Sequence, residues 1–249
     1  MKWGRKIMKI TFIGTGTMGC VTRCNTSMLA DDILFDIGMG TVKQIERLKI
    51  YTKSIKYLVI SHFHADHFLD IPNLLIGRGI RKETESYKLT IIGPIGLRKK
   101  VIDLMNFTHS DGDEHKYDNI EEKYNIEFIE LSNEQQYNTD KFKITALSLK
   151  HGECLPINGY ILEKEDKKIS YACDTSFCDN YYKMCSISNY MFSDVTGLKT
   201  TDMHMGLEDY KQLYKEYPNC IFYAIHRADY DTSEISSVKF PNDGDVLEI

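Results

Sequence analysis

The sequence Ser-His-Phe-His-Ala-Asp-His, at residues 61–67, places three histidines and one carboxylate within six positions of the chain. Imidazole nitrogens and carboxylate oxygens are ligands that zinc and similar divalent metals prefer. The stretch follows an apolar, β-branched run at residues 56–60, which is typical of a buried strand. In α/β folds, ligands usually bind beyond the carboxyl ends of such strands. The pattern therefore predicts a metal site, with a histidine-rich surface loop as the alternative.

This motif, His-x-His-x-Asp-His after a strand, resembles that of the metallo-β-lactamase superfamily of dinuclear hydrolases. In that superfamily the first two histidines bind one metal, and the Asp and the third histidine bind the other. The resemblance also implies three further ligands downstream: a His, a bridging Asp and a last His, each after a strand. The chain has a candidate for each, namely His151 after residues 142–149, Asp174 after 168–173 and His226 after 220–225.

The resemblance thus implies two divalent metal ions, zinc first, with manganese or iron as alternatives. His62, His64 and His151 would bind one ion, and the other ion would be bound by Asp66, His67 and His226. Asp174 would bridge the two, and a metal-bridging hydroxide would be the nucleophile. Asp66 is therefore expected both as a ligand and as part of the catalytic centre, and no other cofactor is expected.

Further motifs are similar to the ribonuclease Z and phosphodiesterase branch of this superfamily. They include Phe12-Ile-Gly-Thr15, Arg23-x-Asn25-Thr-Ser27 and Leu89-Thr-Ile-Ile-Gly-Pro94, and the similarity covers most of residues 8–249. A motif of that branch pairs a carboxylate with a histidine that assists proton transfer. Asp194 and His204 occupy the corresponding positions, so His204 would protonate the leaving alkoxide and Asp194 would orient its ring.

One departure from the branch concerns the substrate. Ribonuclease Z enzymes have a long arm for transfer RNA between the third-motif His and the bridging Asp, whereas here only 22 residues (174 − 151 − 1) separate His151 from Asp174. A phosphodiesterase for a small or flexible, cyclic nucleotide-like diester is therefore the leading expectation. The alternatives are a tRNA 3′-processing endonuclease, a lactone or thioester hydrolase, and a non-catalytic binding protein on the same scaffold.

Other polar residues support no firm role. Asp36 and Ser61 are candidates for hydrogen bonds that fix the ligand histidines, with ordinary structural capping as the equal alternative. His109 and His115 fall in a polar segment, residues 107–122, which is expected to form a loop near the site. Cys20 and Cys24 lack a second cysteine pair and are expected to be free thiols.

Composition limits the class of protein. The chain has 249 residues, 42% hydrophobic and 27% charged, with a formal net charge of −5. That charge does not favour a general nucleic-acid binder, and no apolar run approaches the roughly 20 residues needed to span a bilayer. We expect one cytoplasmic metallo-hydrolase domain over residues 1–249, with residues 1–7 a dispensable extension. The sequence is compatible with a homodimer as well as with a monomer.

Hydrophobic periodicity favours an α/β fold, and the resemblance implies a four-layered αββα sandwich. Helices are expected at 39–50, 67–79, 94–106 and from about His204, the last with Leu207, Tyr210 and Tyr214 on one face. Strands are expected at 8–13, 26–30, 33–36, 56–60, 89–92, 124–131, 141–149, 158–163, 168–173, 220–225 and 245–249.

Overall fold

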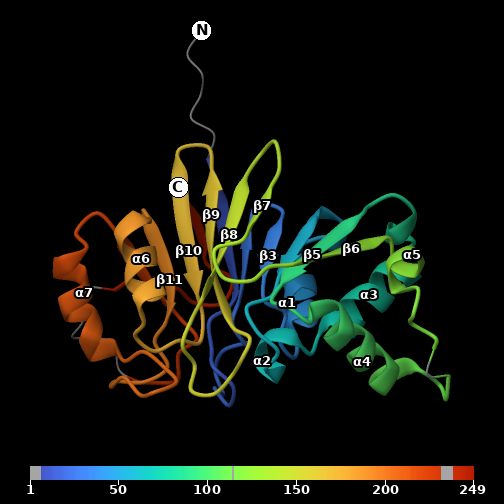
Figure 1. The fold of residues 1–249 in the computed structure, drawn as a ribbon, viewed down its shortest axis with the longest axis horizontal. Helices are drawn as coiled ribbons and strands as arrows, with labels where there is room; N and C mark the ends of the chain where they lie inside the picture. Colours follow the sequence, from blue (N-terminus) through green and yellow to red (C-terminus); the bar gives the residue numbers. More distant parts are fainter. Residues whose placement is uncertain (1–6, 114, 231–237) are drawn as a thin grey trace, which may run out of the picture.

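The computed structural model of the protein describes residues 7–113, 115–230 and 238–249. Within these residues two mixed β-sheets pack face to face, and helices cover both outer faces (Figure 1). The α/β class and the αββα sandwich expected from the sequence are therefore confirmed. Of the extension expected at residues 1–7, only Ile7 lies inside the described residues.

The first sheet has seven strands in the order β13-β1-β2-β3-β4-β5-β6. Strands β3 to β6 run parallel, and β13, β1 and β2 pair antiparallel with their neighbours. The bounds of these strands are Lys9–Gly14 (β1), Ser27–Ala30 (β2), Ile33–Phe35 (β3), Tyr57–Val59 (β4), Leu89–Gly93 (β5), Ile126–Glu130 (β6) and Val246–Glu248 (β13).

The second sheet has six strands in the order β12-β11-β10-β9-β8-β7. Strands β10, β11 and β12 are parallel, and β8 points the same way because both β8 and β10 pair antiparallel with β9. The bounds are Gln136–Asn138 (β7), Lys143–Ser148 (β8), Asn158–Lys164 (β9), Lys167–Ala172 (β10), Tyr190–Asp194 (β11) and Ile221–Ile225 (β12).

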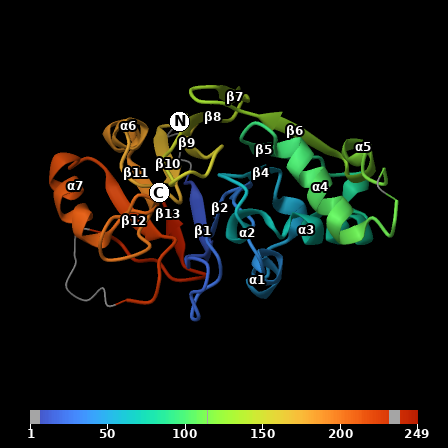
Figure 2. The same ribbon diagram turned by 60° about the horizontal axis from the view of Figure 1, so that its bottom comes forward.

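The helices form the two outer layers, which Figure 2 shows on either side of the sheets. Those of the first half of the chain cover the seven-stranded sheet, and the last two cover the other sheet. Their bounds are Thr41–Arg47 (α1), Ala65–Phe68 (α2), Ile71–Ile80 (α3), Leu97–His109 (α4), Ile120–Tyr124 (α5), Asp179–Ile187 (α6) and Tyr210–Glu216 (α7), with single 3₁₀ turns at Thr52–Ser54, Glu83–Glu85 and Leu207–Asp209.

Three apolar clusters fill the spaces between the four layers. Neighbouring residues of the buried strand β4 divide between two of them: Leu58 packs against the helices and Val59 against the opposite sheet. Ile91 and Ile92 of β5 do the same. Parallel strands buried on both faces have nearly continuous apolar sequences, which is why residues 56–60 and 89–92 were recognisable as strands.

Several expected elements differ in the structure. The helix expected at 67–79 is two helices, α2 and α3, separated at Leu69 and Asp70, with Pro72 in the first turn of α3. His204 lies in a loop before the last helix. That helix begins with a 3₁₀ turn, so Leu213 is buried beside Tyr210 and Tyr214 is 54% exposed. Strands β7 and β11 and helices α5 and α6 have no counterpart among the elements expected from the sequence.

The polar segment at residues 107–122 is also placed differently from the expectation. Helix α4 extends to His109, α5 begins at Ile120, and Tyr117 is buried in the helical layer beside α5. None of the described residues of this segment lines the cavity that holds the predicted ligands.

Among the described residues, every helix is too short or too polar to span a membrane.

The fold brings the chain after β3 into close contact with the metal motif. The Ile37 amide donates to the His67 carbonyl oxygen at 2.8 Å, and the Asp70 amide donates to the Ile37 carbonyl oxygen at 3.0 Å. Between these bonds, a Cβ atom on Gly38 would lie 1.8 Å from the carbonyl oxygen of Asp66. Only glycine allows the two backbones to approach this closely.

We expect Gly38→Ala to destabilise the protein by at least about 1–3 kcal/mol, because the added methyl group forces the Asp66 backbone to move. Urea unfolding measures this change. The matched control is Gly79→Ala in α3, whose added methyl group would meet the Tyr124 ring at an ordinary 3.7 Å. Equal stability of the two variants would contradict the account.

Candidate metal centre

The seven residues predicted as metal ligands converge at one end of the sandwich. They lie just beyond the carboxyl ends of β4, β8, β10 and β12. Their ligand atoms form two groups that share Asp174, and within each group the atoms lie within 4.8 Å of one another. One group holds His62, His64 and His151, and the other holds Asp66, His67 and His226. All seven are buried except His64, which is partly exposed.

The carboxylate of Asp174 lies between the two groups. Its Oδ2 atom is 3.7 Å from His62 Nε2 and 3.6 Å from His151 Nε2. Its Oδ1 atom is 3.1 Å from the Nε2 atoms of both His67 and His226. Each oxygen therefore faces two histidines of one group, as a carboxylate that bridges two cations would.

The backbone is strained at three residues of this region. Asp36, Asp174 and His226 each follow a strand and adopt positive φ angles of 55°, 45° and 51°. Non-glycine residues adopt this left-handed conformation uncommonly, and such outliers concentrate at functional sites. The turn after each strand thus directs a polar side chain towards the cluster.

Two buried nitrogens show that the site suits a divalent cation. His62 Nε2 and His67 Nε2 lie 3.7 and 3.1 Å from Asp174 oxygens, but neither makes a hydrogen bond of suitable geometry with any residue that the structure describes. Buried polar atoms are nearly always satisfied, and a site for an ion is one explanation for an exception. Burial and the neighbouring His67 hold the pKa of His62 well below its usual value, so its imidazole is neutral and can donate a lone pair.

Histidine protons balance the charge of the buried carboxylates in the cluster. Burial opposes ionisation of Asp174, but His226, His67 and His62 hold its pKa well below the usual range. Burial also disfavours protonated His226, yet Asp174, Asp194 and Asp66 raise its pKa to about 10. A metal ion would replace such protons with its own charge, since metal binding to histidine releases protons. The donor set therefore fits a divalent metal.

Asp36 holds two of the ligand histidines on the side of each ring that faces away from the cluster, directly at His67 and through Ser61 at His62. It accepts hydrogen bonds from His67 Nδ1 at 2.8 Å, from Tyr171 OH at 2.8 Å, and from the Ser61 amide and hydroxyl, both at 2.7 Å. The Ser61 oxygen also lies 3.0 Å from His62 Nδ1. Asp36 and Ser61 thus direct the Nε2 atoms of His62 and His67 towards the cluster. The contribution of Tyr171 was not recognised in the sequence.

Asp194 and His204, the predicted proton-transfer pair, are in contact. His204 Nδ1 donates to Asp194 Oδ2 at 2.8 Å. Burial lowers the pKa of His204, but the hydrogen bond and charge of Asp194 outweigh this effect and raise the pKa above its usual value. The His204 ring stacks on that of His226, with ring centroids 5.3 Å apart. The pair therefore lies beside the cluster of predicted ligands.

Thr196 connects this pair to a predicted ligand, a contact that the sequence analysis missed. Its hydroxyl donates to Asp194 Oδ1 at 2.7 Å and lies 2.8 Å from His226 Nδ1. Because the hydroxyl hydrogen goes to the carboxylate, its oxygen accepts from His226. His226 Nε2 is thereby left to face Asp66 and Asp174. Only the position of Thr196, two residues after Asp194, could have suggested this role.

A cavity of about 310 Å³ opens over the cluster. Thr17, Met18, Ala65 and Met203 line it together with ligand residues and His204. Of the other histidines, His115 is exposed and His109 lines a separate cavity beside α1 and α3, so neither belongs to the site. The seven cysteines are free thiols.

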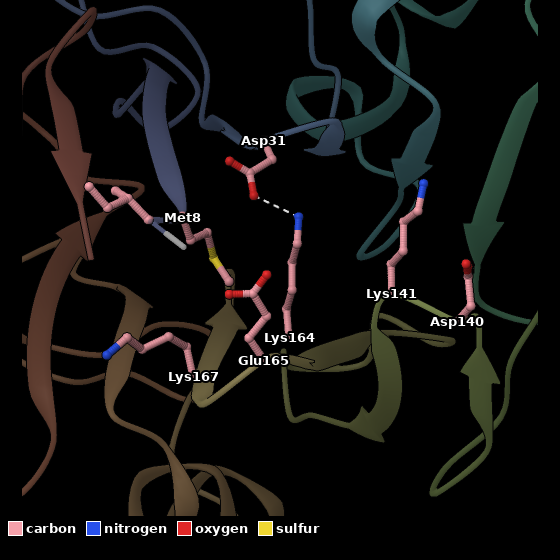
Figure 3. Close-up of a pocket in the computed structure, with 8 residues that line it drawn as sticks. Met8, Asp31, Asp140, Lys141, Lys164, Glu165 and Lys167 are labelled. Carbon is pink, nitrogen blue, oxygen red and sulfur yellow. Dashed lines mark hydrogen bonds and ion pairs between the residues drawn. The ribbon is translucent and has the colours of Figure 1, made fainter. Parts of the chain in front are cut away.

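A larger cavity of about 430 Å³ lies at the amino ends of β1 and β10, away from the predicted ligands (Figure 3). Lysines and carboxylates line it, and Lys164 pairs with Asp31 at 2.6 Å. No histidine or cysteine lines this cavity among the described residues. Because the described residues give this cavity no imidazole or thiolate ligand for a metal such as zinc, its larger volume does not make it the candidate active site.

Known proteins resemble this chain in sequence and in fold. The family model described as Anti-Pycsar protein Apyc1 matches residues 8–240. Ribonuclease Z from Staphylococcus carnosus is 32% identical over 164 residues, which are 63% of this chain and 49% of that protein. The chain thus spans about half the length of the curated relatives it matches.

Two solved structures show the same fold over nearly the whole chain. The metallo-β-lactamase fold protein YhfI from Bacillus subtilis aligns with a TM-score of 0.76 at 18% identity, covering 98% of this chain and 100% of its own. A diphosphatase of the PhnP family aligns with a TM-score of 0.75 at 19% identity, covering 98% of each chain. The metallo-β-lactamase fold expected from the sequence is thereby confirmed.

We expect Thr196→Val, which keeps the side-chain shape but removes the hydroxyl, to lower metal affinity about 10–100-fold by releasing His226. Competition with a chromogenic chelator measures this affinity. Thr196→Ser retains the hydroxyl and should stay close to the wild type. Wild-type affinity in the valine variant would show that the hydroxyl does not orient His226.

Proposed function

The chain belongs to the Anti-Pycsar protein Apyc1 family, and on this premise we propose that it is a dinuclear metal-dependent phosphodiesterase acting on a small phosphodiester. The position of Asp174 carries the proposal, because each of its two oxygens faces two histidines of a different ligand group. Two divalent cations held by one shared carboxylate are the arrangement that phosphoryl-transfer enzymes use.

Each of the two metal ions would be held by three of the predicted ligands and by one oxygen of Asp174. His62, His64 and His151 would hold one ion with Asp174 Oδ2, and Asp66, His67 and His226 would hold the other with Asp174 Oδ1. Histidine and carboxylate ligands suit zinc, and also manganese or iron. When bound, the ions would supply Lewis acidity and a lowered pKa of water at the site. Asp66 Oδ2 also accepts from the Met18 amide at 3.2 Å, which fixes its orientation.

His204 would supply the proton for the leaving group. Its ring lines the cavity, and its Nδ1 is occupied by Asp194. A histidine kept protonated by a buried carboxylate is suited to protonating an alkoxide as the P–O bond breaks. Asp194 would orient the ring and stabilise its cationic form.

The architecture around the cavity favours a small substrate. β9 and β10 follow one another through only Glu165 and Asp166, so no arm for gripping a folded RNA extends between His151 and Asp174. A cavity of about 310 Å³ is at the lower end of the range for small-ligand sites. A cyclic nucleotide-like diester is therefore the substrate class that we propose.

We expect His204→Ala to lower kcat for a nucleoside 3′,5′-cyclic monophosphate about 10²–10⁴-fold, since general acid catalysis typically contributes this much. Hydrolysis of a lactone should fall much less, because its opening needs less acid assistance at the leaving oxygen. His115→Ala, at an exposed position far from the site, is the control. Equal losses for both substrates would remove His204 from the acid role.

We also expect kcat/KM for the cyclic nucleotide to exceed that for a precursor transfer RNA by about tenfold or more, because no arm adds binding energy for the RNA. Both are assayed with the zinc-loaded and the manganese-loaded protein. Bis(p-nitrophenyl) phosphate tests whether the preparation is active at all. Faster cleavage of the precursor RNA would instead favour the 3′-processing endonuclease.

A further inference from the structure

Three buried hydroxyl groups meet behind Asp194. The side chains of Tyr181, Ser193 and Tyr210 are fully buried. Tyr181 OH lies 3.0 Å from Ser193 Oγ and 3.1 Å from Tyr210 OH, and Tyr210 OH lies 2.6 Å from Ser193 Oγ. These residues come from α6, β11 and α7, so the triangle ties both outer helices to the strand that ends at Asp194.

One member of the triangle also contacts Asp194 itself. The Tyr210 hydroxyl donates to the Asp194 main-chain oxygen at 2.9 Å. A carbonyl oxygen has no hydrogen, so the tyrosine must be the donor at this contact. The same hydroxyl is also the donor towards Ser193 Oγ at 2.6 Å, so its one hydrogen is shared between the two acceptors. Burial raises the pKa of the Tyr210 phenol well above its usual value, which keeps that hydrogen in place. No contact of this kind joins Tyr181 to Asp194 among the hydrogen bonds of the described residues.

The contact closes the base of the loop that carries His204. This loop leaves β11 after Asp194 and re-enters helical structure at Leu207. Backbone bonds brace its middle, including Leu207 N to Gly197 O at 2.9 Å. The hydrogen bond from Tyr210 to Asp194 joins the two ends of the loop directly. It adds to the pairing of Asp194 with Ile225 in β12, which holds the same stretch of main chain from the other side.

We propose that Tyr210 is a positioning residue whose buried hydroxyl fixes the main chain at Asp194 and thereby aligns the Asp194–His204 pair. The reaction readout of this inference rests on the proposed function. The alignment itself does not, because it concerns a hydrogen bond that forms with or without a substrate. Tyr210 touches neither the cavity nor the predicted metal ligands, and it acts only through Asp194.

The test compares Tyr210→Phe with Tyr181→Phe, a matched control that removes a hydroxyl from the same triangle without touching Asp194. Two substrates are used: a nucleoside 3′,5′-cyclic monophosphate, whose leaving group is an alkoxide, and bis(p-nitrophenyl) phosphate, whose leaving group needs little protonation. We expect Tyr210→Phe to lower kcat for the cyclic nucleotide about 5–20-fold, the effect of one net hydrogen bond or slightly more. Its KM, its metal content and its turnover of the aryl diester should stay close to wild type.

Proton NMR of histidine-labelled protein gives a second readout that does not depend on turnover. The Nδ1 proton of His204, assigned by its loss in His204→Ala, should appear in the wild type and in Tyr181→Phe. In Tyr210→Phe it should broaden or exchange faster, because the hydrogen bond to Asp194 loosens. Thermal unfolding verifies that each variant is folded, and if Tyr210→Phe does not fold in buffer, the same NMR comparison of Tyr210→Phe and Tyr181→Phe is made in sucrose, which favours the folded state.

The outcomes separate the two proposals. Equal loss for both substrates, equal effects of the two tyrosine variants, or an unchanged His204 proton in Tyr210→Phe would overturn the positioning role. A broadened His204 proton in a protein whose wild type cleaves neither phosphodiester would support the positioning role and overturn the proposed function.

Discussion

The charge on Asp174 is the constraint around which the rest of the centre is organised. A fully buried carboxylate is costly unless cations or hydrogen-bond donors compensate it. Here four histidine nitrogens surround its two oxygens at 3.1–3.7 Å. Histidine protons can compensate this charge, but two divalent cations would satisfy both oxygens and also the His62 and His67 Nε2 atoms, which make no hydrogen bond among the described residues.

The fold supplies this geometry by combining strand ends from both sheets. β4 brings residues 61–67 from one sheet, while the parallel strands β10 and β12, with the equally directed β8, bring Asp174, His226 and His151 from the other. Tight turns at positive φ lie at Asp36, Asp174 and His226, where the strands end beside the cluster. Long-range hydrogen bonds at Asp36 and from His226 to Thr196 help to hold two of these turns.

The sequence was sufficient to name the ligand candidates because the family resemblance implied polar residues after particular strands, and apolar runs marked where those strands end. The same resemblance named Asp194 and His204 as a pair, and the structure places the two side chains in contact. Thr196, Tyr171 and Tyr210 were not assigned roles, because their importance comes from contacts between segments far apart in the chain or from a turn whose geometry the sequence does not specify. Tyr214 was expected on the same face as Leu207 and Tyr210, and this expectation was wrong. The 3₁₀ turn at Leu207–Asp209 shifts the helical phase, so Leu213 is buried in place of Tyr214.

Elemental analysis of the zinc-reconstituted protein tests the central claim most directly, with Asp174→Ala measured beside the wild type. If Asp174 is shared by two ions, the wild type should retain about two equivalents of metal per chain after dialysis, and loss of the shared carboxylate should weaken both sites. The Asp174→Ala protein should then retain well under one equivalent. A single equivalent in the wild type, or two in the variant, would contradict a centre organised around this carboxylate.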